Sequence, residues 1–210
     1  MPRRDLLQTI ERLRRSPLSR LVDSRMGTFR KNRDSEYEVW FSELSFCMLV
    51  AGSAARSGLK AQSRLGPEAF VSMREGQLQR ALKSLGVRFH NRARYIVKAR
   101  ELGDFRLAVL SARNVAEARG WLVDNVCGIG YKEASHFLRN VGFLEVAILD
   151  RHVIRTLFDA GCLSSPEPPT GRDDYLQKEQ TILELAREIS MSPGELDLYI
   201  WYVKTGDVVK

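Results

Sequence analysis

Cysteine is scarce in this sequence of 210 residues. Only Cys47, Cys127 and Cys162 occur, and no pair of them has the CxxC spacing. An odd and scattered set argues against a disulfide framework and against a zinc or iron–sulfur site, and it favours a reducing cytoplasm. No apolar run approaches the roughly 20 residues that a membrane-spanning helix needs. The charged opening segment, residues 1–15, is unlike a secretory signal peptide.

Acidic residues are also in short supply relative to basic ones. The chain has 26 Asp and Glu against 33 Lys and Arg, which gives a net charge of +7. Such an excess favours a polyanionic partner, and nucleic acid is the first candidate. Hydrophobic residues make up 44% and charged residues 28% of the chain, as in ordinary globular proteins. This composition excludes disordered and low-complexity classes.

Strand-like alternation of apolar and polar residues is missing, and helical periodicity replaces it nearly everywhere. The segment 39–50 is apolar on most sides, which predicts the most buried helix. Only Phe143–Leu149 permits an extended segment, and three of the seven prolines fall in one surface loop, 164–171. The sequence therefore predicts an all-α fold. The expected helices cover residues 1–15, 39–50, 91–102, 115–126, 131–141, 151 onward, 173–189 and 193 onward. A second set of apolar residues at helical spacing lies at 18–26, and glycines separate short helices up to residue 85.

Short polar pairs mark the expected start of three helices. In such a pair, the side chain of the first residue accepts a hydrogen bond from the backbone of the second, three positions later. The pairs are Ser35–Glu38, Asn114–Glu117 and Ser192–Glu195.

A tight turn, Gly128-Ile129-Gly130, separates two predicted helices. Glycines allow a turn that is too tight for side chains and let the backbone approach another group closely. The free N–H groups and the positive dipole end of the following helix favour a phosphate, which would be bound without reading of the base sequence. The alternative is an ordinary turn that only packs two helices together.

Two charged residues follow this turn, and each has two interpretations. Lys132 lies in the first turn of the second helix, where a cation opposes the helix dipole. A residue that breaks a local rule is a candidate for function, and the position favours the neutral amine that a nucleophilic lysine needs; the alternative is a solvated surface lysine. Asp150, eighteen residues later, is typical of an N-cap. A fixed carboxylate there also suits stabilisation of positive charge on a sugar ring.

The segment Trp121–Thr156, with VCGIGYKEASHFLRNVG and then ILDRHVIRTL, resembles the helix-hairpin-helix DNA glycosylase superfamily. In that superfamily the glycine hairpin binds a phosphate and an Asp follows the second helix. Bifunctional members place a nucleophilic Lys just after the second glycine. By this resemblance, Lys132 and Asp150 are the catalytic pair, and the backbone of Gly128, Ile129 and Gly130 binds DNA.

Within the superfamily, the chain is most similar to the compact archaeal-type 8-oxoguanine DNA glycosylase/AP lyase group. The chain length, the missing cysteine cluster, the segment RFHNRARYIVKAR and the terminal lysine carry this similarity. One departure is Cys127, where many relatives have Pro. The resemblance implies that Asp197, Trp201 and Lys210 form the base pocket. For Trp201, a core aromatic is the alternative.

Further DNA contacts are predicted before and within the basic segment 91–102. Arg88 and Phe89 are candidates for a wedge that opens the duplex, although Phe89 could instead pack as a hydrophobic staple. Arg92, Arg94 and Lys98 are candidate phosphate contacts, and a solvated charged face is their alternative.

The resemblance also implies an organisation and a function. We expect N-terminal helices (1–35) that pack with the C-terminal lobe, a central lobe (36–141) with the helix-hairpin-helix at about 114–141, a C-terminal lobe (142–210), and an active-site cleft between the lobes. The implied activity is excision of 8-oxoguanine through a lysine Schiff base and β-elimination, without metal or organic cofactor.

The expected partner is double-stranded DNA that contains a damaged base. We expect a monomer that does not bind membranes and acts in the prokaryotic cytoplasm, at the nucleoid. Two alternatives remain open at this point. The first is a glycosylase for another lesion, either an oxidised pyrimidine or a mispaired base. The second is a non-catalytic helix-hairpin-helix module that only binds DNA.

Overall fold

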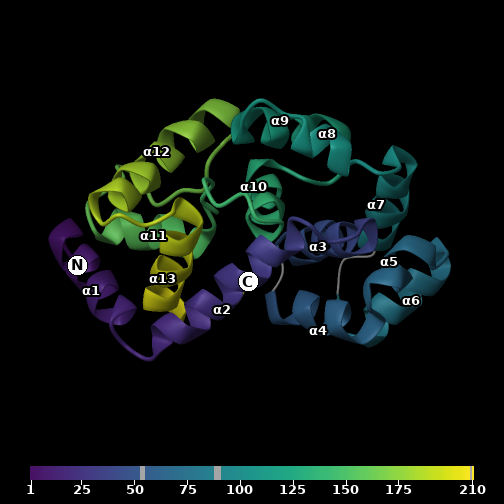
Figure 1. Cartoon of the computed structure of the whole chain (residues 1–210), viewed down its shortest axis with the longest axis horizontal. Coiled ribbons are helices and arrows are strands. Elements are labelled where there is room, and N and C mark those ends of the chain that lie inside the picture. Colours follow the sequence, from purple (N-terminus) through teal and green to yellow (C-terminus); the bar gives the residue numbers. More distant parts are fainter. Residues whose placement is uncertain (53–54, 88–90, 209) are drawn as a thin grey trace. The chain divides into compact units, whose positions relative to one another are not determined.

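The computed structural model describes residues 1–52, 55–87, 91–208 and 210. Within these residues the chain is helical and contains no β-strand, which confirms the predicted all-α class (Figure 1). No helix in the described part of the chain is both long enough and apolar enough to cross a membrane. The helices are α1 Arg3–Arg14, α2 Leu18–Asn32, α3 Tyr37–Val50, α4 Ala55–Leu65, α5 Pro67–Ser72, α6 Glu75–Ser84, α7 Asn91–Ala99, the short 3-10 helix η1 Arg100–Leu102, α8 Arg106–Leu110, α9 Val115–Asn125, α10 Tyr131–Asn140, α11 Arg151–Asp159, α12 Arg172–Glu188 and α13 Pro193–Thr205.

The chain divides into two compact units. The first unit combines Met1–Lys31 with Leu138–Lys210, and the second consists of Asn32–Phe137. The N-terminal helices thus belong to the same unit as the C-terminal part of the chain. The unit boundaries lie at 31/32 and 137/138, compared with 35/36 and 141/142 in the sequence-based division.

The second unit is built around α3. All residues of this helix from Trp40 to Val50 are buried, as its nearly uniform apolar sequence predicts. Phe137 meets the Trp40 ring edge-on at 5.7 Å between centroids, and Phe105 packs beside both rings. This aromatic cluster packs Phe137 of α10 against α3.

The predicted capping box before α3 was wrong in register. The helix begins at Tyr37 with Glu36 as its N-cap, and the Glu36 side chain makes no capping hydrogen bond. Ser35 instead belongs to the turn that ends α2, because its backbone N–H donates to the carbonyl of Asn32 at 3.1 Å. The other two predicted caps are confirmed, since Asn114 and Ser192 accept from the backbone N–H of Glu117 and Glu195.

The first unit packs α1, α11 and α12 against α13. Helix α13 supplies its inner face through Leu196, Leu198, Tyr199 and Ile200, all buried. Helix α1 adds one apolar stripe, and its other residues face outward. This packing surrounds the segment that leads to Asp150.

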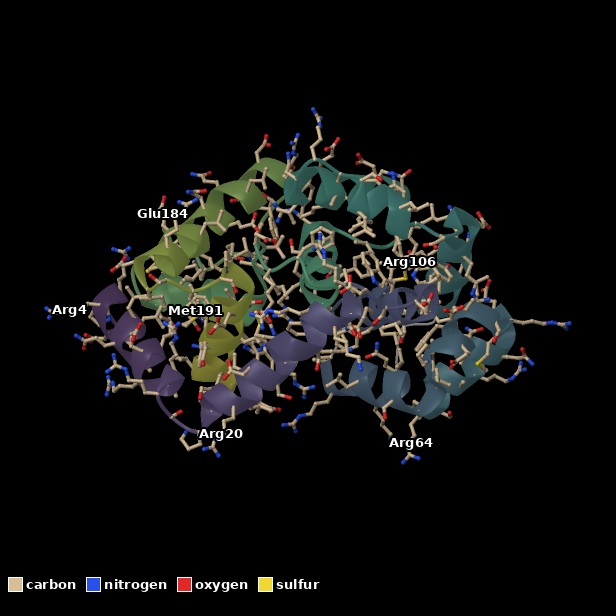
Figure 2. The ribbon with its side chains drawn as sticks, in the orientation of Figure 1. Arg4, Arg20, Arg64, Arg106, Glu184 and Met191 are labelled. Atoms are coloured by element: carbon tan, nitrogen blue, oxygen red, sulfur yellow. The ribbon has the colours of Figure 1, made fainter. Side chains whose placement is uncertain are left out.

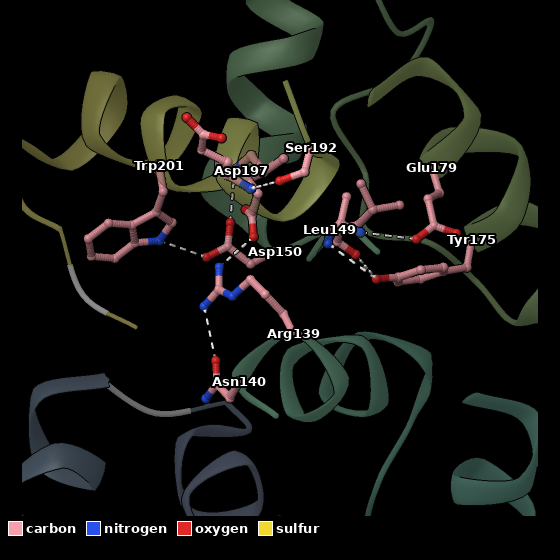
Figure 3. Close-up of polar contacts among 12 residues, drawn as sticks. Arg139, Asn140, Leu149, Asp150, Tyr175, Glu179, Ser192, Asp197 and Trp201 are labelled. Atoms are coloured by element: carbon pink, nitrogen blue, oxygen red, sulfur yellow. Dashed lines mark hydrogen bonds and ion pairs between the residues drawn. The ribbon is translucent and has the colours of Figure 1, made fainter. Parts of the chain in front are cut away.

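That segment, residues 146–149, is buried but irregular, so the extended stretch expected at 143–149 forms no strand. Its backbone is satisfied by side chains of α12. The Ala147 N–H donates to Glu179 Oε1 at 3.2 Å, the Leu149 N–H donates to Tyr175 Oη at 3.3 Å, and the Tyr175 hydroxyl donates to the Ala147 carbonyl at 2.8 Å (Figure 3). Because buried backbone groups need partners, these bonds hold the chain in one path up to Asp150.

Candidate active site

The glycine hairpin connects α9 to α10 as predicted. Gly128 has a φ of +85°, in the left-handed region, and a Cβ atom there would lie 2.6 Å from Cδ2 of Tyr95. Both facts exclude a side chain at this position. Ile129 is buried and anchors the hairpin to the second unit, while Gly128 and Gly130 are exposed. The turn therefore presents backbone rather than side chains to solvent at the start of α10.

Lys132 lies in the first turn of α10, directly after this hairpin. Its side chain is 28% exposed, and its Nζ lies 3.2 Å from Oε1 of Glu133. Glu133 folds back over the hairpin, because its Oε2 would lie 3.4 Å from a Cβ atom at Gly130. A carboxylate at a helix N-terminus is favourable, so Glu133 offsets the unfavourable position of the ammonium group. This direct pairing was not predicted from the sequence.

The rest of α10 in the second unit is packed inward. His136 is buried and meets Phe46 edge-on at 5.4 Å, as expected for a packed histidine. Arg119 of α9 is also buried and donates to Ser135 Oγ at 3.0 Å. Among the described residues, no group of three or more His, Cys, Asp or Glu side chains could hold a metal ion.

Asp150 is the N-cap of α11 in the first unit, which confirms that prediction. Its Oδ1 accepts hydrogen bonds from the backbone N–H groups of His152 and Val153, each at 2.8 Å. Its Oδ2 accepts a hydrogen bond from the indole N–H of Trp201 on α13 at 2.9 Å (Figure 3). Three donors therefore fix this carboxylate. The Trp201 ring also meets the His152 ring edge-on, at 6.0 Å between centroids.

Behind Asp150, Asp197 forms a buried ion pair with Arg139. The Arg139 Nη1 lies 2.7 Å from Asp197 Oδ2, and both side chains are only 3% exposed. Burial, together with the nearby Asp150, raises the pKa of Asp197 to about 7 against the opposing effect of Arg139. The Ile148 N–H also donates to Asp197, so this carboxylate ties the segment before Asp150 to α13. Sequence reasoning missed Arg139 entirely.

The remaining candidates for the base pocket lie at the end of the chain. Trp201 is half-buried, so it is not a fully buried core residue. Lys210 is also half-buried. Lys204, which shares a helix face with Asp197 and Trp201 in the sequence, pairs instead with Asp159 at 3.1 Å on the surface.

The candidate DNA contacts of the 91–102 segment are not equivalent. Arg88 and Phe89 lie outside the described residues. Arg94 and Lys98 are exposed on α7, whereas Arg92 is half-buried and donates to the carbonyl of Ala51. The Arg100 side chain turns inward and donates to the carbonyls of Phe70 and Met73, both at 2.8 Å. Helix α7 ends at Ala99 rather than at residue 102, so Arg100 lies in η1.

A known protein family matches most of this chain. A sequence model described as 8-oxoguanine DNA glycosylase matches residues 22–191, most of the chain. The chain belongs to the 8-oxoguanine DNA glycosylase family. The match includes Lys132 and Asp150 and ends before Trp201 and Lys210.

Individual members of the 8-oxoguanine DNA glycosylase family resemble the chain over nearly its whole length. An 8-oxoguanine DNA glycosylase/AP lyase of Methanocaldococcus jannaschii is 41% identical and covers 98% of this chain and 99% of its own. A crystal structure of the M. jannaschii 8-oxoguanine glycosylase/lyase with a 15mer DNA containing 8-oxoguanine matches with a TM-score of 0.93, 40% identity and coverage of 98% and 99%. The Thermotoga maritima 8-oxoguanine DNA glycosylase structure matches with a TM-score of 0.90, 38% identity and coverage of 99% and 100%.

Proposed function

We propose that this protein is a bifunctional 8-oxoguanine DNA glycosylase and AP lyase. The observation that carries the proposal is Lys132 on the first turn behind the glycine hairpin, in a chain that belongs to the 8-oxoguanine DNA glycosylase family. Double-stranded DNA with a damaged base is the substrate. Because similar sequences come from archaea and bacteria, the chromosomal DNA of a prokaryotic nucleoid is the site of action.

The backbone N–H groups of Gly128, Ile129 and Gly130 bind a phosphate of the DNA. This contact is independent of sequence and positions the damaged strand. Arg94 and Lys98, both exposed, add phosphate contacts, while Arg92 supports the site through Ala51. The damaged nucleotide leaves the base stack, at a cost of a few kcal/mol, before its glycosidic bond can react.

Lys132 is the nucleophile. Its amine must lose a proton before it attacks, and Glu133 Oε1, 3.2 Å away, is placed to accept that proton. The neutral amine adds to C1′ of the deoxyribose while the C1′–N9 bond breaks, and the base leaves with the electron pair of that bond and takes up a proton. Opening of the sugar ring gives a Schiff base between Nζ and C1′. Loss of a proton from C2′ then expels the 3′ phosphate and cuts the strand.

Asp150 stabilises the positive charge that develops on the sugar ring. An ionised carboxylate has about four lone-pair positions, and three N–H donors already occupy three of them. This arrangement leaves little capacity for moving protons and favours an electrostatic role.

The damaged base contacts Trp201 and Lys210. Asp197 supports this pocket from behind, because its carboxylate is already held by Arg139 and by the Ile148 N–H. Deletion of Lys210 is therefore expected to slow 8-oxoguanine excision more than cleavage at a preformed abasic site, which has no base to recognise. Equal loss of both activities would contradict the assignment of Lys210 to the pocket.

Borohydride trapping tests the central step. Incubation of the wild-type protein with an 8-oxoguanine duplex and borohydride is expected to give a covalent protein–DNA adduct, and Lys132→Gln is expected to abolish it. Lys83→Gln, which removes an exposed lysine of α6, is the matched control and retains the adduct. Absence of any wild-type adduct would overturn the proposal and leave a non-catalytic DNA-binding module.

Asp150→Asn tests the acid separately. Asn also caps helices well, so the variant is expected to fold and bind DNA while excision slows. Loss of DNA binding together with an unfolded protein would instead assign Asp150 a purely structural role. A panel of duplexes with oxidised purines, oxidised pyrimidines and mismatches tests the choice of lesion, and 8-oxoguanine is expected to be excised fastest.

A further inference from the structure

The positive charge of this protein is concentrated at one end of the chain. Residues 1–33 hold ten of the 33 basic residues but only three of the 26 acidic ones. The other 177 residues hold 23 of each, so the entire net charge of +7 lies in this segment. The hairpin, Lys132 and Asp150 all belong to the part of the chain that has no net charge. A polyanion drawn by the overall charge is therefore drawn first to the N-terminal helices.

Helix α1 presents these charges in a regular row. Leu6, Leu7 and Ile10 face the core of the first unit. Arg4, Gln8 and Arg12 follow one another at intervals of four residues and are all exposed. At 1.5 Å per residue, Arg4 and Arg12 are separated by about 12 Å along the helix axis. Figure 2 shows the Arg4 side chain extending away from the ribbon.

An open hollow lies beside this row. It has a volume of about 930 Å³ and is formed by α1 and the end of α12. Its acidic lining residues already have partners within the protein, since Glu188 pairs with Arg3 and Glu11 lies 3.7 Å from Arg15. In the described part of the chain, no carboxylate lies within ion-pairing distance of Arg4 or Arg12. Arg12 Nε donates to the Gln8 carbonyl at 3.3 Å, and the terminal N–H groups of both guanidinium groups are available to an external anion.

We propose that Arg4 and Arg12, with the hollow beside them, bind the phosphate backbone of duplex DNA. This surface is additional to the glycine hairpin and to the contacts on α7. The planar guanidinium group matches a phosphate with two parallel hydrogen bonds. One strand of B-DNA carries a phosphate about every 3.4 Å of its axis, so the row spans roughly three to four nucleotides.

A phosphate backbone fits this surface better than a peptide does. The apolar lining of the hollow is confined to Leu7 and Ile189, and Leu7 is only 8% exposed. The rest of the lining consists of charged and polar side chains, whereas an amphipathic peptide helix needs a row of apolar side chains to dock against. The phosphate backbone of a DNA strand needs only the positive charge of the arginines and the concave shape of the hollow. Such a surface holds the protein on undamaged DNA without reading its sequence.

The salt dependence of binding to undamaged duplex tests this proposal. Each phosphate contact contributes about 0.9 to the slope of log affinity against log salt concentration, so Arg4→Gln/Arg12→Gln is expected to flatten the slope by about 1.8. The ratio of wild-type to variant affinity for the duplex is then expected to be about tenfold larger at about 50 mM salt than at about 200 mM salt. The control Arg64→Gln/Arg80→Gln removes the same charge from exposed positions of α4 and α6 and is expected to keep the wild-type slope. Equal slopes for the wild type and the α1 variant would overturn the proposal.

Photo-crosslinking locates the contact directly. A photoreactive amino acid at Gln8, between the two arginines, is expected to crosslink to the duplex, whereas one at the exposed Gln79 of α6 is not. Crosslinking of Gln8 to poly-glutamate but not to the duplex would identify an acidic protein segment as the partner and would also overturn the proposal. Because both assays use undamaged DNA, their outcome is independent of excision. A protein that binds in this way without excising 8-oxoguanine would contradict only the proposed function.

Discussion

The hydrogen bond from Trp201 to Asp150 leads to the sharpest prediction. The indole N–H donates to the carboxylate at 2.9 Å, so in the proposed mechanism Trp201 acts on the sugar through Asp150 as well as offering a ring to the base. Trp201→Phe removes the N–H and keeps an aromatic ring. A hydrogen bond to a charged group contributes about 1.5–3 kcal/mol. If this contribution is expressed in the transition state, excision slows by about 10- to 160-fold, since each 1.36 kcal/mol is tenfold in rate.

The assay is single-turnover excision from an 8-oxoguanine duplex, with urea denaturation to confirm that the variant is folded. Trp121→Phe, at another half-buried tryptophan, is the matched control and is expected to keep the wild-type rate. In an Asp150→Asn background, Trp201→Phe is expected to have a smaller effect, because coupled residues are not additive. A folded Trp201→Phe variant with the wild-type rate would refute the reasoning and leave Trp201 only a stacking role.

Three further predictions concern stability and are measured by urea denaturation. Arg139→Met is expected to destabilise the protein by about 3–5 kcal/mol, because it leaves Asp197 buried without its partner; a loss below 1 kcal/mol would contradict this. Since the pKa of Asp197 is raised to about 7, the folded state binds a proton more tightly than the unfolded state. The stability of the wild type relative to Asp197→Asn is therefore expected to fall by about 1.4 kcal/mol per pH unit between pH 5 and 7, and a constant difference would contradict it. Gly128→Ala is expected to lower the free energy of unfolding by more than the about 1–3 kcal/mol that a positive φ alone costs, because its Cβ would also clash with Tyr95. Adding Tyr95→Ala to this variant is expected to recover only the part of the loss that is due to the clash.

Local signals in the sequence determined much of this structure correctly. The N-caps at Asn114, Asp150 and Ser192 depend on residues two or three positions apart, and the glycine hairpin depends on three consecutive residues. Such interactions form within one turn of chain, so a residue pattern is enough to indicate them. Ser35 belongs to the turn that ends α2, so α3 begins one residue later than the predicted capping box implies.

Only the tertiary structure decided how the candidate acid is held. Trp201 lies 51 residues from Asp150, Arg139 lies 58 residues from Asp197, and Tyr175 and Glu179 reach back to an irregular segment about 30 residues earlier. No spacing rule links such residues, because a partner at that distance is chosen by the packing of α10, α12 and α13 rather than by the chain between them. The sequence by itself thus determined the all-α class, the hairpin and the positions of the two candidate catalytic residues. The tertiary structure decided which side chains hold the carboxylate, because a buried polar group must be satisfied by whatever the fold brings next to it.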